Sequence, residues 1–125
     1  MNNKIEKKKT LFIIGLPGCG KTTLSKILAK YLNYNFYDLD LIIEEKEKMK
    51  ISQIFEMSGE KYFREKESEI LEELSKLKNA IISTGGGIIL SQKNREIMKK
   101  KGITIFINRN PEILLNNIDA SERPL

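Results

Sequence analysis

The sequence contains no histidine and a single cysteine, Cys19, among its 125 residues. Without histidine, catalysis by an imidazole and metal ligation by an imidazole are both excluded. A lone cysteine cannot form an internal disulfide, which is typical of a protein in a reducing compartment. No apolar run approaches the roughly 18 residues of a membrane span, and no signal-peptide core follows the lysine-rich start. We therefore expect a cytoplasmic protein without a membrane partner.

The charge pattern argues against a nucleic-acid partner. The formal net charge is +5, and 31% of the residues are charged. Lysines alternate with glutamates, as over residues 44–48, which indicates solvated helix faces and no basic groove. The length is that of one domain. We expect a flexible N-terminal tail over residues 1–9 and a single domain over residues 10–125.

Short apolar runs alternate with segments of helical periodicity. The runs predict strands near residues 10–14, 35–39, 80–83 and 103–107. Helices are expected at about residues 21–32, 41–48, 60–77, 91–101 and 111–118, and the first of them carries an apolar stripe at Leu24, Ile27, Leu28, Tyr31 and Leu32. Strands that alternate with helices predict an α/β domain whose parallel sheet is covered on both faces.

A glycine-rich loop follows the first predicted strand. It reads Gly15, four residues, Gly20, Lys21 and Thr22. Such a loop turns its backbone N–H groups toward an anion at the start of a helix, the lysine binds the β- and γ-phosphates, and the threonine hydroxyl binds Mg²⁺. The loop therefore predicts binding of ATP. Cys19 within it is either a small residue in a tight turn or an activated thiol at the nucleotide site.

Two carboxylates, Asp38 and Asp40, close the second predicted strand. If the strand continues through them, alternation places both on the same side, at the sheet edge where open α/β folds bind ligands. One would serve Mg²⁺ and the other would orient or deprotonate an acceptor hydroxyl. The alternative is that Asp40 caps the helix predicted from residue 41.

A charged pair interrupts the apolar face of the predicted helix over residues 60–77. The inward positions are Phe63, Glu67, Ile70, Leu74 and Leu77, with Arg64 one turn before Glu67. Either Glu67 holds Arg64 in a cleft, ready to bind an anion, or the two form an ordinary surface ion pair.

Three consecutive glycines, Gly85 to Gly87, follow the third predicted strand, where they permit close approach of a ligand to the backbone. The alternative is a merely flexible loop. Near the end of the sequence, Arg123 either reaches the γ-phosphate or belongs to a frayed terminus.

Taken in order and spacing, these elements resemble the shikimate kinase family from about residue 10 onward. The elements are residues 15–22, Asp38-Leu39-Asp40, Phe63-Arg64 with Glu67, Gly85-Gly86-Gly87 and Arg123-Pro124-Leu125. The resemblance implies a P-loop NTPase-like, three-layer α/β/α fold. It also implies ATP-dependent phosphorylation of the shikimate 3-hydroxyl, in aromatic amino-acid biosynthesis, with Mg²⁺ as cofactor and ATP and shikimate as partners.

The same resemblance assigns roles to residues. ATP contacts fall to Gly15, Gly18, Cys19, Gly20, Lys21, Thr22, Thr23 and Arg123. Metal binding falls to Thr22 and, through water, to Asp38, and catalysis to Lys21, Asp40 and Arg123. Substrate contacts fall to Asp40, Arg64, Gly85, Gly86 and Gly87.

The sequence departs from the family at its end, because family members continue well past the Arg-Pro-Leu segment. We expect sheet order 2-3-1-4 without the family's fifth strand. The fourth strand is then an edge through which an otherwise monomeric chain can self-associate. We also expect weakened ATP binding and poor or absent turnover. A gluconate-type or nucleoside-monophosphate kinase and a non-catalytic nucleotide-binding remnant are the competing interpretations.

Overall fold

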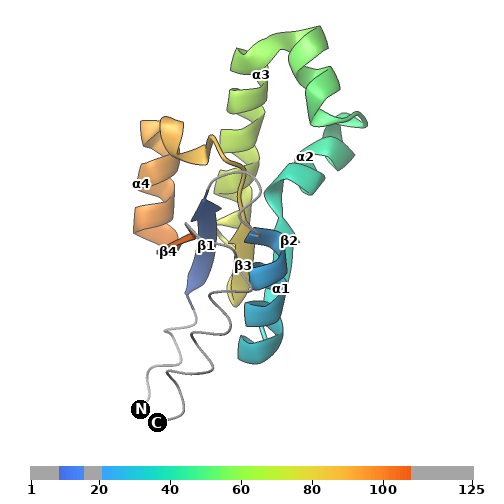
Figure 1. Ribbon diagram of the computed structural model, residues 1–125. Coiled ribbons are helices and arrows are strands. Elements are labelled where there is room, and N and C mark those ends of the chain that lie inside the picture. The colour runs from blue at the N-terminus through green and yellow to red at the C-terminus, as the bar shows by residue number, and fades with distance from the viewer. Residues whose placement is uncertain (1–8, 16–20, 108–125) are drawn as a thin grey trace.

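The computed structural model describes residues 9–15 and 21–107, and Figure 1 shows their arrangement. The elements in chain order are β1 (Thr10–Gly15), α1 (Lys21–Leu32), β2 (Asn35–Asp38), α2 (Leu39–Glu47), α3 (Ile51–Leu74), β3 (Ala80–Ser83), the 3₁₀ helix η2 (Ile88–Leu90), α4 (Gln92–Lys101) and β4 (Gly102–Ile107). The helix predicted over 111–118 lies outside the described residues.

The strands form one parallel sheet in the order β2-β3-β1-β4, as predicted. β1 lies inside the sheet, where Leu11 is in register with Ile81 of β3 on one side and with Ile103 of β4 on the other. Parallel strands put their carboxyl ends on one edge, which is where such sheets bind ligands. The segments that follow β1, β2 and β3 therefore gather at that edge.

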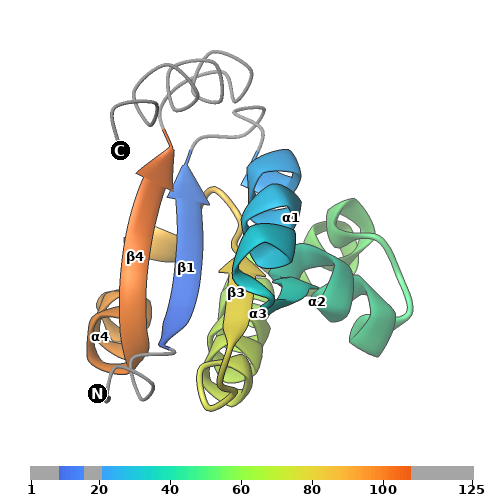
Figure 2. The same cartoon turned by 90° about the horizontal axis from the view of Figure 1, so that it is seen from below.

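Side-chain alternation along β1 builds two apolar cores, one on each face of the sheet. Phe12 and Ile14 pack with residues of α2, α3 and α4, whereas Ile13 packs with Leu24 and Ala29 of α1. Figure 2 shows α1 on one side of the strands and α3 and α4 on the other. The result is the predicted three-layer architecture. None of the helices in the described ranges is long and apolar enough to cross a membrane.

Helix α3 consists of two helical parts that meet at Gly59, whose φ of 90° and ψ of 165° are not helical. The second part follows Gly59 and so begins near residue 60, as predicted. It is shorter at its end than predicted. The helix ends at Leu74, and Leu77 lies beyond it with 38% exposure. The inward face consequently stops one turn earlier than the apolar periodicity predicted.

β4 forms one edge of the described sheet. Its residues Ile103 and Phe106 are 50% and 53% exposed. Apolar residues on an edge strand favour pairing with another chain. Among the described residues, no strand pairs with the outer side of β4, as predicted.

The turn from α4 into β4 requires glycine at residue 102. A Cβ on Gly102 would collide with the backbone carbonyl oxygen of Thr10 and lie 3.1 Å from Phe12 Cε2. Gly102→Ala is expected to lower the free energy of unfolding by about 1–3 kcal/mol, because backbone cannot yield as a side chain can. Urea denaturation checks this, with the exposed neighbour Lys101→Ala as control. Equal midpoints for the two variants would show that the turn adjusts without cost.

Candidate active site

The donor side of the site begins at the end of β1. Lys21, the first residue of α1, donates a hydrogen bond from Nζ to the carbonyl oxygen of Gly15 at 3.1 Å. This hydrogen bond therefore connects the two ends of the glycine-rich loop. Thr22 and Thr23 follow in the exposed first turn of α1. The predicted ATP contacts Gly18, Cys19 and Gly20 lie outside the described residues.

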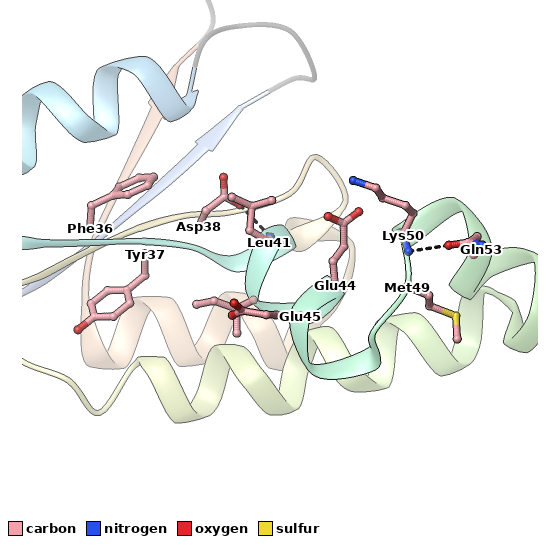
Figure 3. A pocket seen from close by; sticks show the side chains of 10 residues that line it. Phe36, Tyr37, Asp38, Leu41, Glu44, Glu45, Met49, Lys50 and Gln53 are labelled. Atoms are coloured by element: carbon pink, nitrogen blue, oxygen red, sulfur yellow. Dashed lines mark hydrogen bonds between the residues drawn. The ribbon is translucent and has the colours of Figure 1, made fainter.

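Asp38 performs two tasks at the end of β2. Its Oδ1 accepts a hydrogen bond from the backbone N–H of Leu41 at 3.2 Å and so caps α2 (Figure 3). Its Oδ2 accepts a hydrogen bond from the Thr22 hydroxyl at 3.5 Å. The two residues that the sequence predicted at the metal thus lie within hydrogen-bonding distance of each other. The capping alternative for Asp40 is wrong, because the strand ends at Asp38 and Asp38 is the cap.

Asp40 lies in the first turn of α2 and faces the glycine segment after β3. A Cβ placed on Gly85 would lie 2.9 Å from Asp40 Oδ1. Burial raises the pKa of Asp40, the Asp38 carboxylate raises it further, and Lys21 and Arg64 oppose this. A half-buried carboxylate with a raised pKa beside two cations is suited to orienting a hydroxyl and accepting its proton. The prediction that both aspartates lie on the same side of one strand is wrong. Asp38 ends β2, and Asp40 lies in the first turn of α2.

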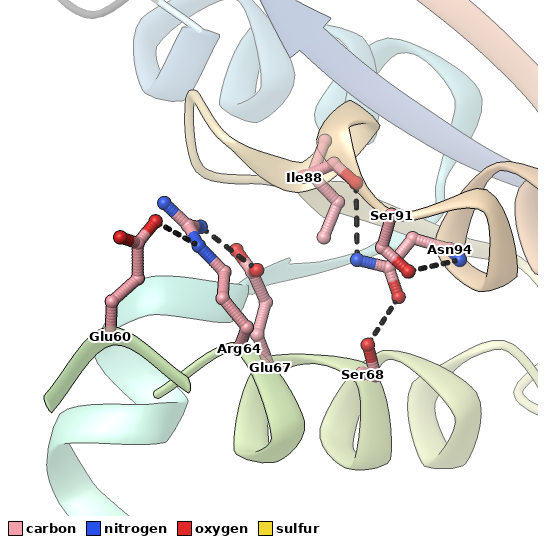
Figure 4. A network of polar contacts seen from close by, with 7 residues as sticks. All are labelled: Glu60, Arg64, Glu67, Ser68, Ile88, Ser91 and Asn94. Carbon is pink, nitrogen blue, oxygen red and sulfur yellow. Dashed lines mark hydrogen bonds and ion pairs between the residues drawn. The ribbon is translucent and has the colours of Figure 1, made fainter. Parts of the chain in front are cut away.

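Arg64 and Glu67 form a partly buried ion pair on α3. Arg64 Nη1 lies 3.0 Å from Glu67 Oε1, and the Glu67 side chain is 1% exposed (Figure 4). Glu60 binds Arg64 Nε at 3.4 Å from the other side. Burial raises the pKa of Glu67, and the hydrogen bond and charge of Arg64 oppose that shift. The surface-pair alternative is wrong, since Glu67 is buried and fixes the guanidinium.

The guanidinium of Arg64 lies against the backbone of the glycine segment. A Cβ on Gly87 would approach Arg64 Nη2 to 2.5 Å. Gly85 is buried and Gly86 exposed. Glycine at residues 85 and 87 therefore allows the side chains of Asp40 and Arg64 to lie close to the backbone. The backbone of Gly86 is exposed. Together, Asp40 and Arg64 bracket this segment with a carboxylate at one end and a guanidinium at the other.

Aromatic rings line the guanidinium, and one of them was not predicted. The Phe55 and Phe63 rings lie 4.9 Å apart, and the Arg64 guanidinium carbon lies 5.2 Å from the Phe63 centroid and 5.9 Å from that of Phe55. Phe55 remains 37% exposed. Phe55 lies before Gly59, outside the helix predicted over residues 60–77, so the apolar periodicity of that helix gave no sign of it.

A hollow is lined by residues of β2, of α2 and of the start of α3 (Figure 3). Its lining includes the carboxylates of Asp38, Glu44 and Glu45 and one cation, Lys50. An anionic acceptor would meet net negative charge there. The cationic side chain that an acid requires is Arg64, so the glycine segment is the better candidate for the acceptor site.

Comparison with known proteins decides the family. The sequence matches the family described as "Shikimate kinase" over residues 17–125. The chain belongs to the shikimate kinase family. Among curated members, the shikimate kinase of Alkaliphilus oremlandii is 49% identical over 119 residues, which cover 94% of this chain and 70% of that protein. A shikimate kinase of Clostridium botulinum is 48% identical, over 94% of this chain and 71% of that protein.

Solved shikimate kinases share the fold. The enzyme of Acinetobacter baumannii, in complex with shikimate, aligns with a TM-score of 0.81 and 36% identity, over 98% of this chain and 69% of that chain. The shikimate kinase of Aquifex aeolicus aligns with a TM-score of 0.77 and 40% identity, over 85% of this chain and 63% of that chain. As a member of the shikimate kinase family, the chain is an ATP-dependent kinase.

Proposed function

We propose that this chain transfers the γ-phosphoryl group of ATP to the 3-hydroxyl of shikimate, in aromatic amino-acid biosynthesis. The observation that supports this most is the bracketed glycine segment. Arg64, held by buried Glu67, lies against Gly87, and the Asp40 carboxylate lies against Gly85. A guanidinium suits a carboxylate, and a carboxylate suits hydroxyls. Shikimate carries both groups on one ring.

The donor side of the proposal rests on the glycine-rich loop. Its glycines and Cys19 would offer backbone N–H groups to the phosphates, with Thr23 beside them and Lys21 neutralising the β- and γ-phosphates. The hydroxyl–carboxylate pair of Thr22 and Asp38 offers oxygen ligands of the kind that Mg²⁺ prefers. Thr22 would bind the ion directly and Asp38 through water. Bound Mg²⁺ would neutralise charge on the transferring phosphate.

In the transfer step, the acceptor oxygen forms a bond to the γ-phosphorus while the bond to the β–γ bridging oxygen breaks, releasing ADP. Asp40 accepts the proton of the acceptor hydroxyl. Arg64 and the backbone at Gly86 fix the acceptor carboxylate, which positions the hydroxyl for in-line attack. Arg123, outside the described residues, is assigned to stabilise the transferring phosphoryl group. We further propose that the enzyme is cytoplasmic and monomeric.

The decisive experiment is ATP turnover by this chain with shikimate, with the phosphorylated product identified by mass spectrometry. Lys21→Ala is expected to reduce turnover by about 10²- to 10³-fold, because it removes a charge aimed at the transferring phosphate. Lys30→Ala, at the far end of α1, is the matched control and is expected to act as the wild type. Turnover with gluconate in place of shikimate would favour the gluconate-type kinase. Nucleotide binding without transfer at high enzyme concentration would favour the non-catalytic interpretation.

A further inference from the structure

A buried hydrogen bond joins α3 to α4. The Ser68 hydroxyl donates to Asn94 Oδ1 at 2.6 Å, and the two residues are 9% and 1% exposed. A neutral polar pair in a core gains little over an apolar pair of the same shape, and it is costly if either partner is lost. The placement of this bond therefore matters more than its contribution to stability.

Asn94 extends the connection to the glycine segment. Its Nδ2 donates to the carbonyl oxygen of Ile88 at 3.0 Å, and its backbone N–H donates to Ser91 Oγ at 3.3 Å (Figure 4). Ile88 directly follows Gly87 and begins η2. One side-chain amide thus ties α3 to the residue next to the glycine that Arg64 contacts. We name the connection from Ser68 through Asn94 to the Ile88 carbonyl the Ser68–Asn94 bridge.

The bridge and the guanidinium act on the same two elements. Arg64 and Ser68 are four residues apart on α3 and so lie on one face, and Gly87 and Ile88 are consecutive. Helix α3 therefore meets the glycine segment at two points, through the Arg64 guanidinium at Gly87 and through the bridge at Ile88. The hydrogen bonds of the bridge hold Ile88 at a set distance from α3, and this limits how far the Arg64 guanidinium and the Gly87 backbone can separate.

We propose that Ser68 and Asn94 are positioning residues for the acceptor carboxylate. They set the separation of Arg64 from the backbone of Gly86 and Gly87, and they touch neither ATP nor the acceptor themselves. The identity of the acceptor rests on the proposed function. The proposed connection between the two helices and the glycine segment stands without it.

Two variants test the bridge at different points. Ser68→Ala removes the donor to Asn94, and Asn94→Asp keeps the shape but places an oxygen against the Ile88 carbonyl. Each is expected to raise KM for shikimate about tenfold or more, since small misplacements of a binding group carry large penalties. KM for ATP is expected to stay unchanged. Ser68→Thr keeps the hydroxyl and is expected to retain a KM near that of the wild type.

Lys93→Ala is the matched control. Lys93 and Glu72 join the same two helices across the surface at 3.8 Å, with side chains 61% and 50% exposed. Breaking this pair is expected to leave both KM values unchanged. If Lys93→Ala raises KM for shikimate as much as Ser68→Ala does, or if KM for ATP rises in parallel in the bridge variants, the proposal is overturned.

A second readout does not depend on turnover. In ¹⁵N-resolved spectra, Ser68→Ala is expected to shift the Gly87 amide and the Arg64 Nε–H signals and to leave the Lys30 amide in place. Unchanged signals would overturn the bridge proposal. If the wild type fails to bind shikimate, the proposed function is wrong, and these signals alone decide the bridge. If Asn94→Asp does not fold, Ser68→Ala is sufficient.

Discussion

Asp40→Asn is expected to reduce turnover by about 10²- to 10⁴-fold, the usual effect of removing a general base, and at the same time to stabilise the fold. The carboxylate is half-buried, and burial and the neighbouring Asp38 raise the pKa of Asp40. Ionisation of Asp40 therefore costs free energy in the folded state. The amide has the same shape without the charge, so the variant is expected to gain on the order of 1 kcal/mol at neutral pH.

The pH dependence of this gain follows from the direction of the shift. The pKa of Asp40 is higher in the folded than in the unfolded state, so the wild type loses stability as pH rises from the unfolded-state pKa to the folded-state pKa. Below the ordinary aspartate pKa of about 4, Asp40 is neutral in both states, and the difference in stability between the wild type and Asp40→Asn disappears. Thermal denaturation of both proteins at acid and neutral pH measures it. A variant less stable than the wild type at neutral pH would contradict this explanation.

Arg64→Met is expected to remove shikimate binding and to lower the free energy of unfolding by about 3–5 kcal/mol, the usual penalty for leaving a buried charge without its partner. Glu67 is 1% exposed on its side chain. Its Oε2 already has no hydrogen-bond partner among the described residues. With the guanidinium gone, nothing opposes the effect of burial on the pKa of Glu67. The loss of stability is therefore expected to grow as pH rises from acid to neutral.

The double variant Arg64→Met/Glu67→Met separates stability from binding. Replacing both charges with side chains of similar length is expected to recover most of the stability, because paired burial of charge gains little over apolar packing. Shikimate affinity is expected to stay lost, since a thioether side chain in place of the guanidinium cannot bind a carboxylate. Urea denaturation and calorimetric titration measure the two effects. Retained affinity in either variant would rule out Arg64 as the carboxylate-binding residue.

Most of the sheet could be predicted because its strands are short apolar runs that end at glycine or a polar residue. Helix α1 shows where this fails. Ile27 and Tyr31 were expected to face the core, yet they are 41% and 82% exposed. Ser25 and Ala29 are buried in their place. Small side chains let the helix lie close to the sheet, and apolar periodicity alone does not reveal which face makes that close contact.

The candidate site was predictable where spacing is local. Arg64 and Glu67 are three residues apart on one helix, so their pairing followed from helical geometry. The roles of Asp38 and Asp40 depended on where β2 ends, and element boundaries are the least certain part of a sequence interpretation. The bond between Ser68 and Asn94 spans 26 residues. Serine and asparagine are common on helix surfaces, and no local pattern marks a pair that meets only after α3 and α4 pack.

The position of β1 inside the sheet determines when the nucleotide site can form during synthesis. β1 leaves the ribosome first, but its partners β3 and β4 both lie in the second half of the sequence. Until β3 emerges, the apolar run of β1 has no strand to pair with and is exposed to chaperones and to other nascent chains. The phosphate-binding end of the protein is thus translated early and assembled late. Synonymous codon changes that slow translation between α1 and β3 should prolong that exposed interval.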